Sequence, residues 1–120
     1  MLQKVVRIAK LYDYYGPLLS RRQREFIELY YHYDLSLGEI AQQYGVSRQA
    51  VHDILRRAED ALERFEARLG FLQQRAKWKQ TWLVIFEELN SFRADASGLS
   101  LGDKKRLDRI LERTQEALGY

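Results

Sequence analysis

Four side chains near the middle of the chain have the types and the spacing to contact nucleic acid. Arg48, His52 and Arg56 recur every four residues, with Gln49 beside them, so all four share one side of a helix. Arginine forms paired hydrogen bonds with guanine, and glutamine forms paired bonds with adenine. The pattern therefore predicts a nucleic-acid contact on this side, which also includes Ser47 directly before Arg48. A solvated helix surface with ion pairs such as Arg56–Asp60 is the alternative interpretation.

Further arginines could bind the phosphate backbone beside this contact. Arg57 follows on the same helix, whereas Arg21 and Arg22 begin an earlier expected helix. Cationic side chains on phosphate oxygens fix the register of a protein on nucleic acid without reading its sequence. We therefore predict that these three arginines flank the contact. For Arg21 and Arg22, simple solvation of a first helical turn is the alternative.

Catalytic and metal-binding chemistry finds little support in the sequence. The histidines His32 and His52 have no metal-ligand spacing to each other or to a carboxylate, and cysteine is absent. Glu87 and Glu88 have the placement of ordinary helix-surface carboxylates, and no glycine-rich phosphate-binding loop occurs. We expect a binding protein that is not an enzyme and that uses no metal and no cofactor.

The elements that must position the candidate contact form a helix-turn-helix over residues 36–58. Ser36 and Glu39 have the spacing of a capping box at the start of a helix. Gly45 stands where a tight turn needs a backbone with positive φ, and Ser47 follows as the cap of the next helix. The apolar and small residues suited to the shared core are Ile40, Ala41, Tyr44, Val46, Val51 and Ile54. Together these signals predict a module that reads nucleic acid or descends from one that does.

The segments before and after the motif are also helical in pattern, which predicts an all-α fold. Residues 2–15 form an amphipathic segment closed by a Gly-Pro pair, and Ser20 with Gln23 forms another capping box. Near the other end, residues 94–98 read as a loop, and Ser100 begins a last helix. Long helices with few breakers therefore account for nearly the whole chain.

The helix that begins after Ser47 carries an apolar seam longer than a three-helix core requires. Its residues alternate at intervals of four and three, as in a heptad repeat: Val51, Leu55, Ala58, Leu62, Phe65, Leu69 and Leu72. A second seam of the same spacing comprises Trp78, Trp82, Ile85, Leu89 and Phe92. We predict that the outer half of the first seam is buried against the second seam or against another copy of the chain, with a homodimer favoured over a monomer.

Gly70 either ends or bends this long helix, and we place the domain boundary there. The sequence then predicts a helix-turn-helix domain over residues 1–70 and a C-terminal helical extension over residues 71–120. The extension is expected to pack on the long helix or on a dimer partner.

Composition and charge narrow the class of protein. The 120 residues are 46% hydrophobic and 31% charged, which is typical of a soluble globular protein. The absence of cysteine, of an export pattern and of a long apolar run favours the cytoplasm and no membrane contact. The net charge is +3, yet residues 20–70 hold eight basic and nine acidic side chains. A motif without positive excess predicts few phosphate contacts.

The segment from about Leu11 to Leu69 resembles the YlxM-like family of small bacterial proteins. The resemblance rests on the tyrosine-rich stretch FIELYYHYDLSLGEIA, on the turn VSRQAVHD and on the long charged helix that follows. That family in turn resembles the fourth region of bacterial sigma factors, which bears the same kind of helix-turn-helix. The resemblance implies a sigma-region-4-like bundle with a long fourth helix and a C-terminal helical extension.

For function, the resemblance implies a role in protein targeting. YlxM-like proteins are linked to the signal recognition particle, so the expected role is that of an accessory or regulator whose suspected partner is the particle's RNA or protein. A DNA-binding transcriptional regulator and a protein-interaction scaffold with a vestigial helix-turn-helix are the alternatives. The arginine and glutamine pattern favours the first two hypotheses, and the near-neutral charge of the motif favours the first and third.

Overall fold

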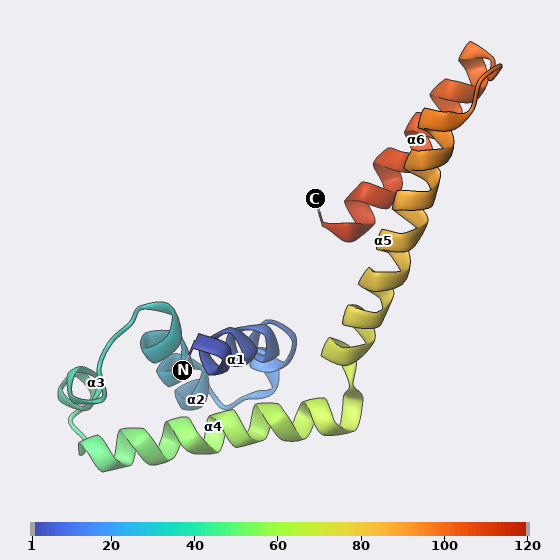
Figure 1. The fold of residues 1–120 in the computed structure, drawn as a ribbon. Coiled ribbons are helices and arrows are strands. Elements are labelled where there is room, and N and C mark those ends of the chain that lie inside the picture. The colour runs from blue at the N-terminus through green and yellow to red at the C-terminus, as the bar shows by residue number, and fades with distance from the viewer. Residues whose placement is uncertain (1, 120) are drawn as a thin grey trace. The chain divides into compact units, whose positions relative to one another are not determined.

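The computed structural model describes residues 2–119 and contains six α-helices and no strand within that range, which confirms the predicted all-α fold (Figure 1). The helices are α1 (Leu2–Tyr15), α2 (Arg21–Ile27), α3 (Leu37–Tyr44), α4 (Arg48–Leu69), α5 (Phe71–Asp95) and α6 (Leu101–Leu118). A 3-10 turn, η1 (Gly16–Leu18), joins α1 to α2, and a π-helical turn, η2 (Glu28–His32), follows α2.

The chain divides into two compact units, of which the first ends at Leu72 and the second begins at Gln73. The division falls two residues beyond Gly70, where the sequence places the boundary. Whether the two units act as separate domains stays a prediction. No helix within residues 2–119 is long and apolar enough to cross a membrane.

Two capping boxes start helices in the first unit, as the sequence predicts. The Ser20 hydroxyl accepts a hydrogen bond from the Gln23 amide at 3.2 Å, and the Gln23 side chain accepts one from the Ser20 amide at 3.1 Å. Ser36 and Glu39 form the same reciprocal pair at the start of α3, with both distances 3.1 Å. Each box satisfies two amide groups that a helix terminus leaves without an intrahelical partner.

The core of the first unit forms on α4, which α1, α2 and α3 all contact (Figure 1). Its buried residues come from all four helices and from the turn after α1: Ile8, Leu11, Tyr15, Leu19, Phe26, Ile27, Ile40, Ala41, Val51, Leu55, Ala58, Ala61 and Leu62. Burial of each large side chain in this set contributes roughly 1.5–3 kcal/mol. The inner half of the predicted seam on α4 is therefore core.

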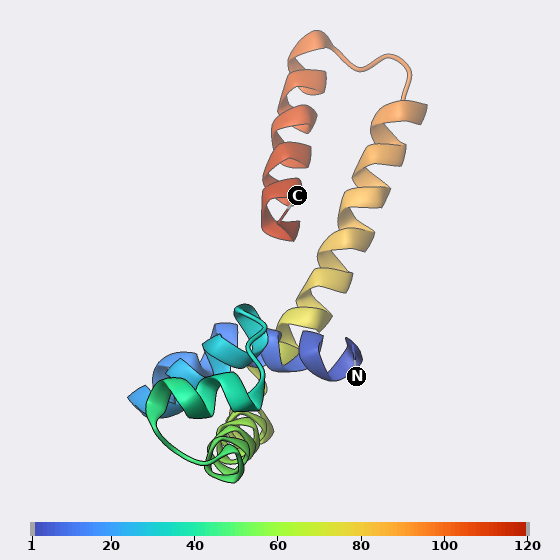
Figure 2. The same cartoon turned by 90° about the vertical axis from the view of Figure 1, so that its left-hand side faces the viewer.

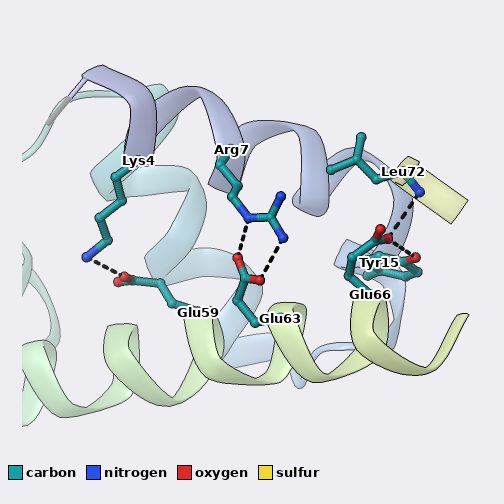
Figure 3. A network of polar contacts seen from close by, with 7 residues as sticks. All are labelled: Lys4, Arg7, Tyr15, Glu59, Glu63, Glu66 and Leu72. Atoms are coloured by element: carbon teal, nitrogen blue, oxygen red, sulfur yellow. Dashed lines mark hydrogen bonds and ion pairs between the residues drawn. The ribbon is translucent and has the colours of Figure 1, made fainter. Parts of the chain in front are cut away.

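Polar contacts hold α1 along the middle of α4 (Figure 3). Lys4 Nζ lies 2.8 Å from Glu59 Oε1, and Arg7 donates to both carboxylate oxygens of Glu63 at 2.6 and 2.8 Å. The hydrogen bonds from Arg7 hold the pKa of Glu63 below its ordinary value. These pairs fix the register of α1 on α4, while the apolar core supplies most of the stability.

Gly70 ends α4 rather than bending it, because it adopts the left-handed conformation with a φ of 64°. The first amides of α5 find partners in the preceding helices: the Phe71 amide donates to the Tyr15 hydroxyl and the Leu72 amide donates to Glu66, each at 3.1 Å. Tyr15 in turn donates to Glu66 at 2.6 Å (Figure 3). This network gives partners to two amides at the start of α5 that have no intrahelical acceptor.

The outer residues of the predicted seam differ in how far they are buried. Phe65 and Leu72 are partly buried against the core of the first unit, whereas Leu69 is 48% exposed. Two of the three outer positions thus obtain part of their burial within their own unit. Burial of the seam against residues 78–92 or a second copy stays a prediction.

The second unit is a hairpin in which α5 and α6 run antiparallel (Figure 2). Arg93 on α5 forms an ion pair with Asp108 on α6, and Ser100 caps α6 as predicted. In the described part of the unit, the buried residues lie on α6: Leu107, Thr114 and Leu118. The loop begins later than the expected residue 94, because the helical pattern of α5 continues through Asp95.

Candidate nucleic-acid interface

The turn between α3 and α4 has the predicted helix-turn-helix geometry. Gly45 ends α3 with a φ of 65°, and its amide donates to the Ala41 carbonyl. Ser47 has an extended backbone, and its hydroxyl accepts a hydrogen bond from the Ala50 amide at 3.0 Å, so it caps α4. Because Gly45 and Ser47 are only two residues apart, α4 begins directly after α3 ends.

The four side chains of the predicted contact are exposed on the first turns of α4. Val51 and Leu55, on the core-facing side of the helix, are buried. Arg48 lies at the edge nearest α3, where its Nε atom is 3.7 Å from the position that a Cβ on Gly38 would occupy. A Cβ at residue 38 would make only ordinary van der Waals contact there, so the arginine side chain lies against the start of α3.

An acidic residue that the sequence reasoning did not include, Asp53, lies among these side chains. Gln49 Nε2 donates to Asp53 Oδ1 at 3.0 Å, and His52 Nδ1 lies 3.7 Å from the same oxygen. This bond uses one of the two N–H groups of the Gln49 amide, so the other N–H and the carbonyl oxygen stay available to pair with a base. Asp53 lowers the positive potential of the surface, and it also supplies an acceptor suited to the amino group of cytosine.

His52 and Arg56 also line a groove of about 760 Å³ between α4 and α1. Across the groove from them lie Lys4 of α1 and the η2 tyrosines Tyr30 and Tyr31. The other residues lining the groove are Gln3, Val5, Arg7, Ile8, Leu37, Leu55, Glu59, Asp60 and Glu63. Three arginine or lysine side chains therefore face three carboxylates, so the groove carries no positive excess.

The sequence reasoning missed this groove because a π-helical turn shapes one of its walls. In η2 the Tyr33 amide donates to the Glu28 carbonyl at 3.0 Å, five residues earlier. Nothing in the residue types marks this departure from α-helical bonding. Tyr30 and Tyr31 meet edge to face with ring centres 5.0 Å apart, and burial raises the pKa of Tyr31. A π turn of this kind is frequent near functional sites.

Arg21 and Arg22, predicted to contact phosphate, interact with groups of α2 and α3. Arg21 Nε lies 3.0 Å from Glu25 Oε1, and the guanidinium carbon of Arg22 lies 5.6 Å from the ring centre of Tyr44. Tyr44 donates to the other Glu25 oxygen at 2.8 Å, and this bond with that from Arg21 lowers the pKa of Glu25. Arg22 thus contacts α3 through Tyr44, Arg21 forms its pair within α2, and neither arginine lines the groove.

Arg57 is exposed next to Arg56 on α4, about 100° further around the helix. The structure therefore brings Arg48, Gln49, His52 and Arg56 together with Asp53 on one surface, and leaves Arg57 at its margin. Binding of nucleic acid by these residues and by Ser47 stays a prediction. Within residues 2–119, no group of three or more potential ligand side chains is placed to hold a metal ion.

Comparison with known proteins places this chain among helix-turn-helix proteins. Residues 2–97 match the model of the UPF0122 family, described as "Putative helix-turn-helix protein, YlxM / p13 like". The match includes α5, so it extends beyond the segment on which the sequence resemblance rests.

Curated relatives agree with this assignment. A UPF0122 protein of Desulforamulus reducens is 44% identical over 111 residues, which cover 92% of this chain and 95% of the relative. One from Acetivibrio thermocellus is 40% identical over 115 residues, covering 96% and 97%. One from Symbiobacterium thermophilum is 50% identical over 98 residues, covering 80% and 88%. The chain belongs to the UPF0122 family of YlxM- and p13-like helix-turn-helix proteins.

Proposed function

We propose that this protein is a non-enzymatic binding protein that contacts nucleic acid through the first turns of α4. The observation that supports the proposal most directly is the set of exposed polar side chains, Arg48, Gln49, His52 and Arg56, directly after a helix-turn-helix turn. This is the part of a helix-turn-helix that enters a groove in proteins that read DNA. Its side chains need no backbone change to reach a ligand.

We further propose that the protein serves the signal recognition particle as an accessory or regulator. The support is its membership of the YlxM-like family, together with a surface whose charge is nearly balanced. Asp53 beside Gln49 and the carboxylates of the groove disfavour the many phosphate contacts of a strong duplex-DNA binder. A structured RNA with loops or unpaired bases needs fewer such contacts.

A DNA-binding regulator is the second candidate function. Arg56 and Gln49 have the chemistry to pair with guanine and adenine, and the exposed start of α4 has the size to enter the major groove of B-DNA. The deep and narrow major groove of A-form RNA would exclude the same helix. The two candidates therefore differ in the ligand they predict.

Salt titrations of binding to duplex DNA and to the RNA of the particle test the site. We expect the logarithm of the binding constant to fall only slowly with the logarithm of the salt concentration, with a slope that corresponds to on the order of two to four released counterions, because few phosphates can be neutralised. Replacing Arg48 and Arg56 together by alanine should weaken binding roughly tenfold or more and leave the circular dichroism spectrum unchanged. Both side chains are exposed, so the fold does not depend on them.

The double variant Arg64→Ala/Arg68→Ala is the matched control. It removes the same charge from exposed positions of the same helix, two or more turns beyond Arg56. Binding should therefore fall less in this control than in the Arg48/Arg56 variant. Equal losses in both would show that only total charge matters, and no binding of either ligand by the parent protein would favour a protein-interaction scaffold.

Isolation of the protein from cells with and without ribonuclease tests the role in protein targeting. If contact runs through RNA, the particle's protein should co-purify only when its RNA is intact. Retention of that protein after ribonuclease treatment would indicate direct protein contact. Absence of particle components from both preparations would contradict the targeting role.

A further inference from the structure

One face of α5 is apolar and exposed within the second unit. Trp78, Ile85 and Phe92 are seven residues apart, so they form a line along the helix. Their exposed fractions are 60%, 37% and 56%, and Trp82 beside them is 42% exposed. Soluble monomers rarely expose contiguous apolar surface of this extent. We call this surface, Trp78–Trp82–Ile85–Phe92, the α5 face.

The hairpin partner α6 leaves the α5 face open. It packs beside this face, on the side where Arg93 pairs with Asp108 and where Leu83 and Phe86 are half-buried, and Leu89 at the border of the α5 face is half-buried as well. Within the described part of this unit, α5 itself has no buried residue. Two helices alone rarely bury enough apolar surface for a stable fold, whereas two such hairpins can combine in a four-helix bundle.

The charge distribution along α5 indicates what covers this face. Its first half carries basic residues and no acidic one, and its second half opens with acidic residues: Arg75, Lys77 and Lys79, then Glu87 and Glu88. This polarity is the reverse of the one that the helix macrodipole favours. An antiparallel second copy of α5 would place the basic half of each helix against the acidic half of the other.

The positions of Lys77 and Glu88 make this complementarity specific. The two residues are eleven positions apart, which is about three turns, so they lie along the same edge of the α5 face. In an antiparallel pair related by a twofold axis, this edge of one helix lies along the same edge of the other helix, and the two edges run in opposite directions. Lys77 then lies opposite Glu88 of the partner subunit, and the symmetry repeats this contact.

We propose that the α5 face binds a second copy of this chain in an antiparallel homodimer, with Lys77 facing Glu88 of the partner subunit. Parallel pairing would place like charges together along the whole helix. The dimer presents two helix-turn-helix units to any ligand. The inference does not depend on the proposed function, because α4 takes no part in the interface.

Charge reversal tests the pairing by sedimentation of the full chain over a range of concentrations. Lys77→Glu alone and Glu88→Lys alone should each raise the dimer dissociation constant about tenfold or more, because each places two like-charge pairs in the interface. The double variant Lys77→Glu/Glu88→Lys restores opposite charges and should recover dimerisation. Lys105→Glu and Glu112→Lys, exposed changes on α6, are matched controls that should leave the dimer intact.

A monomeric parent chain would overturn the proposal, as would a double variant that dimerises no better than either single variant. Nucleic-acid binding measured on the same samples keeps this result apart from the function of α4. If a charge-reversed variant dimerises less but binds nucleic acid with the same affinity per chain as the parent protein, the substitution has changed only the dimer.

Cysteine cross-linking tests the antiparallel direction, since the chain has no cysteine of its own. We expect a disulfide-linked dimer when Lys77→Cys and Glu88→Cys chains are mixed, and none when either variant is oxidised alone. In the antiparallel pair, two copies of one position are about 16 Å apart along the helix, far beyond the reach of a disulfide. Cross-linking of each variant with itself would indicate parallel pairing and overturn the proposal.

Discussion

The two units of the chain bury their apolar residues to very different extents. In the first unit, α4 carries a core to which α1, α2 and α3 all contribute, and Phe26 is fully buried. In the second unit α5 has no buried residue within the described range, and Phe92 is 56% exposed. Both units are helical and similar in charge density, so composition alone does not cause the difference.

This difference indicates which kind of surface each unit offers to partners. The first unit encloses its apolar residues and leaves polar ones exposed at the start of α4, a surface suited to a polar ligand. The second unit leaves aromatic side chains exposed on α5, a surface suited to an apolar partner. Nucleic-acid contact and self-association are thus expected from separate parts of one small protein.

The largest effect on stability is expected when a phenylalanine is replaced by alanine, in the first unit in one variant and in the second unit in another. Phe26→Ala should destabilise the first unit by about 3–5 kcal/mol, because it leaves a cavity in a close-packed core. Phe92→Ala should leave the stability of the first unit unchanged, because Phe92 belongs to the second unit and is largely exposed. Urea unfolding followed by far-ultraviolet circular dichroism measures both effects.

Tryptophan fluorescence separates the two units in the same experiment, because Trp78 and Trp82 both lie on α5. In Phe26→Ala, the dichroism transition should move to lower urea while the fluorescence transition keeps its midpoint. If the two probes instead shift together, the units unfold as one and the comparison between them fails.

A smaller effect is expected at the network that joins α4 to the start of α5. Tyr15→Phe removes a hydroxyl that donates to Glu66 and accepts from the Phe71 amide. The loss should cost about 1–3 kcal/mol, because a buried network then loses two hydrogen bonds. Tyr14→Phe, at the neighbouring and 38% exposed tyrosine, is the control and should change the urea midpoint little. Equal midpoints for the two variants would contradict a stabilising role for the network.

The local chemistry of helix ends could be predicted from the sequence. Ser20, Ser36, Ser47 and Ser100 all cap helices as expected, and Gly45 has the positive φ that the turn needs. These features depend on residues within three positions of each other. A one-dimensional pattern contains all the information they require.

Features that depend on several elements could not be predicted in this way. The groove beside His52 and Arg56 needs the π-helical turn at Glu28–His32 and the placement of α1 on α4. The spacing of Lys4 and Arg7, matched to Glu59 and Glu63, carried a signal for that placement, but only once α1 and α4 were known to pack together. Gln49 and Asp53 are four residues apart, so their spacing alone carried a signal for the bond between them.

The smallest effect concerns the pairs between α1 and α4. Arg7 lowers the pKa of Glu63 in the folded state, so the carboxylate stabilises the fold at pH values above its unfolded pKa and loses this contribution as pH falls through the lower, folded pKa. Both side chains are partly exposed, so Glu63→Gln should cost at most about 1 kcal/mol near neutral pH. The difference from the parent protein should shrink as the pH falls below about 4. Asp60→Asn, an exposed acidic neighbour outside these pairs, is the control for general charge effects in the urea titrations. A Glu63→Gln deficit that persists at acid pH would show that packing of this side chain, and not its ion pair with Arg7, holds α1 in place.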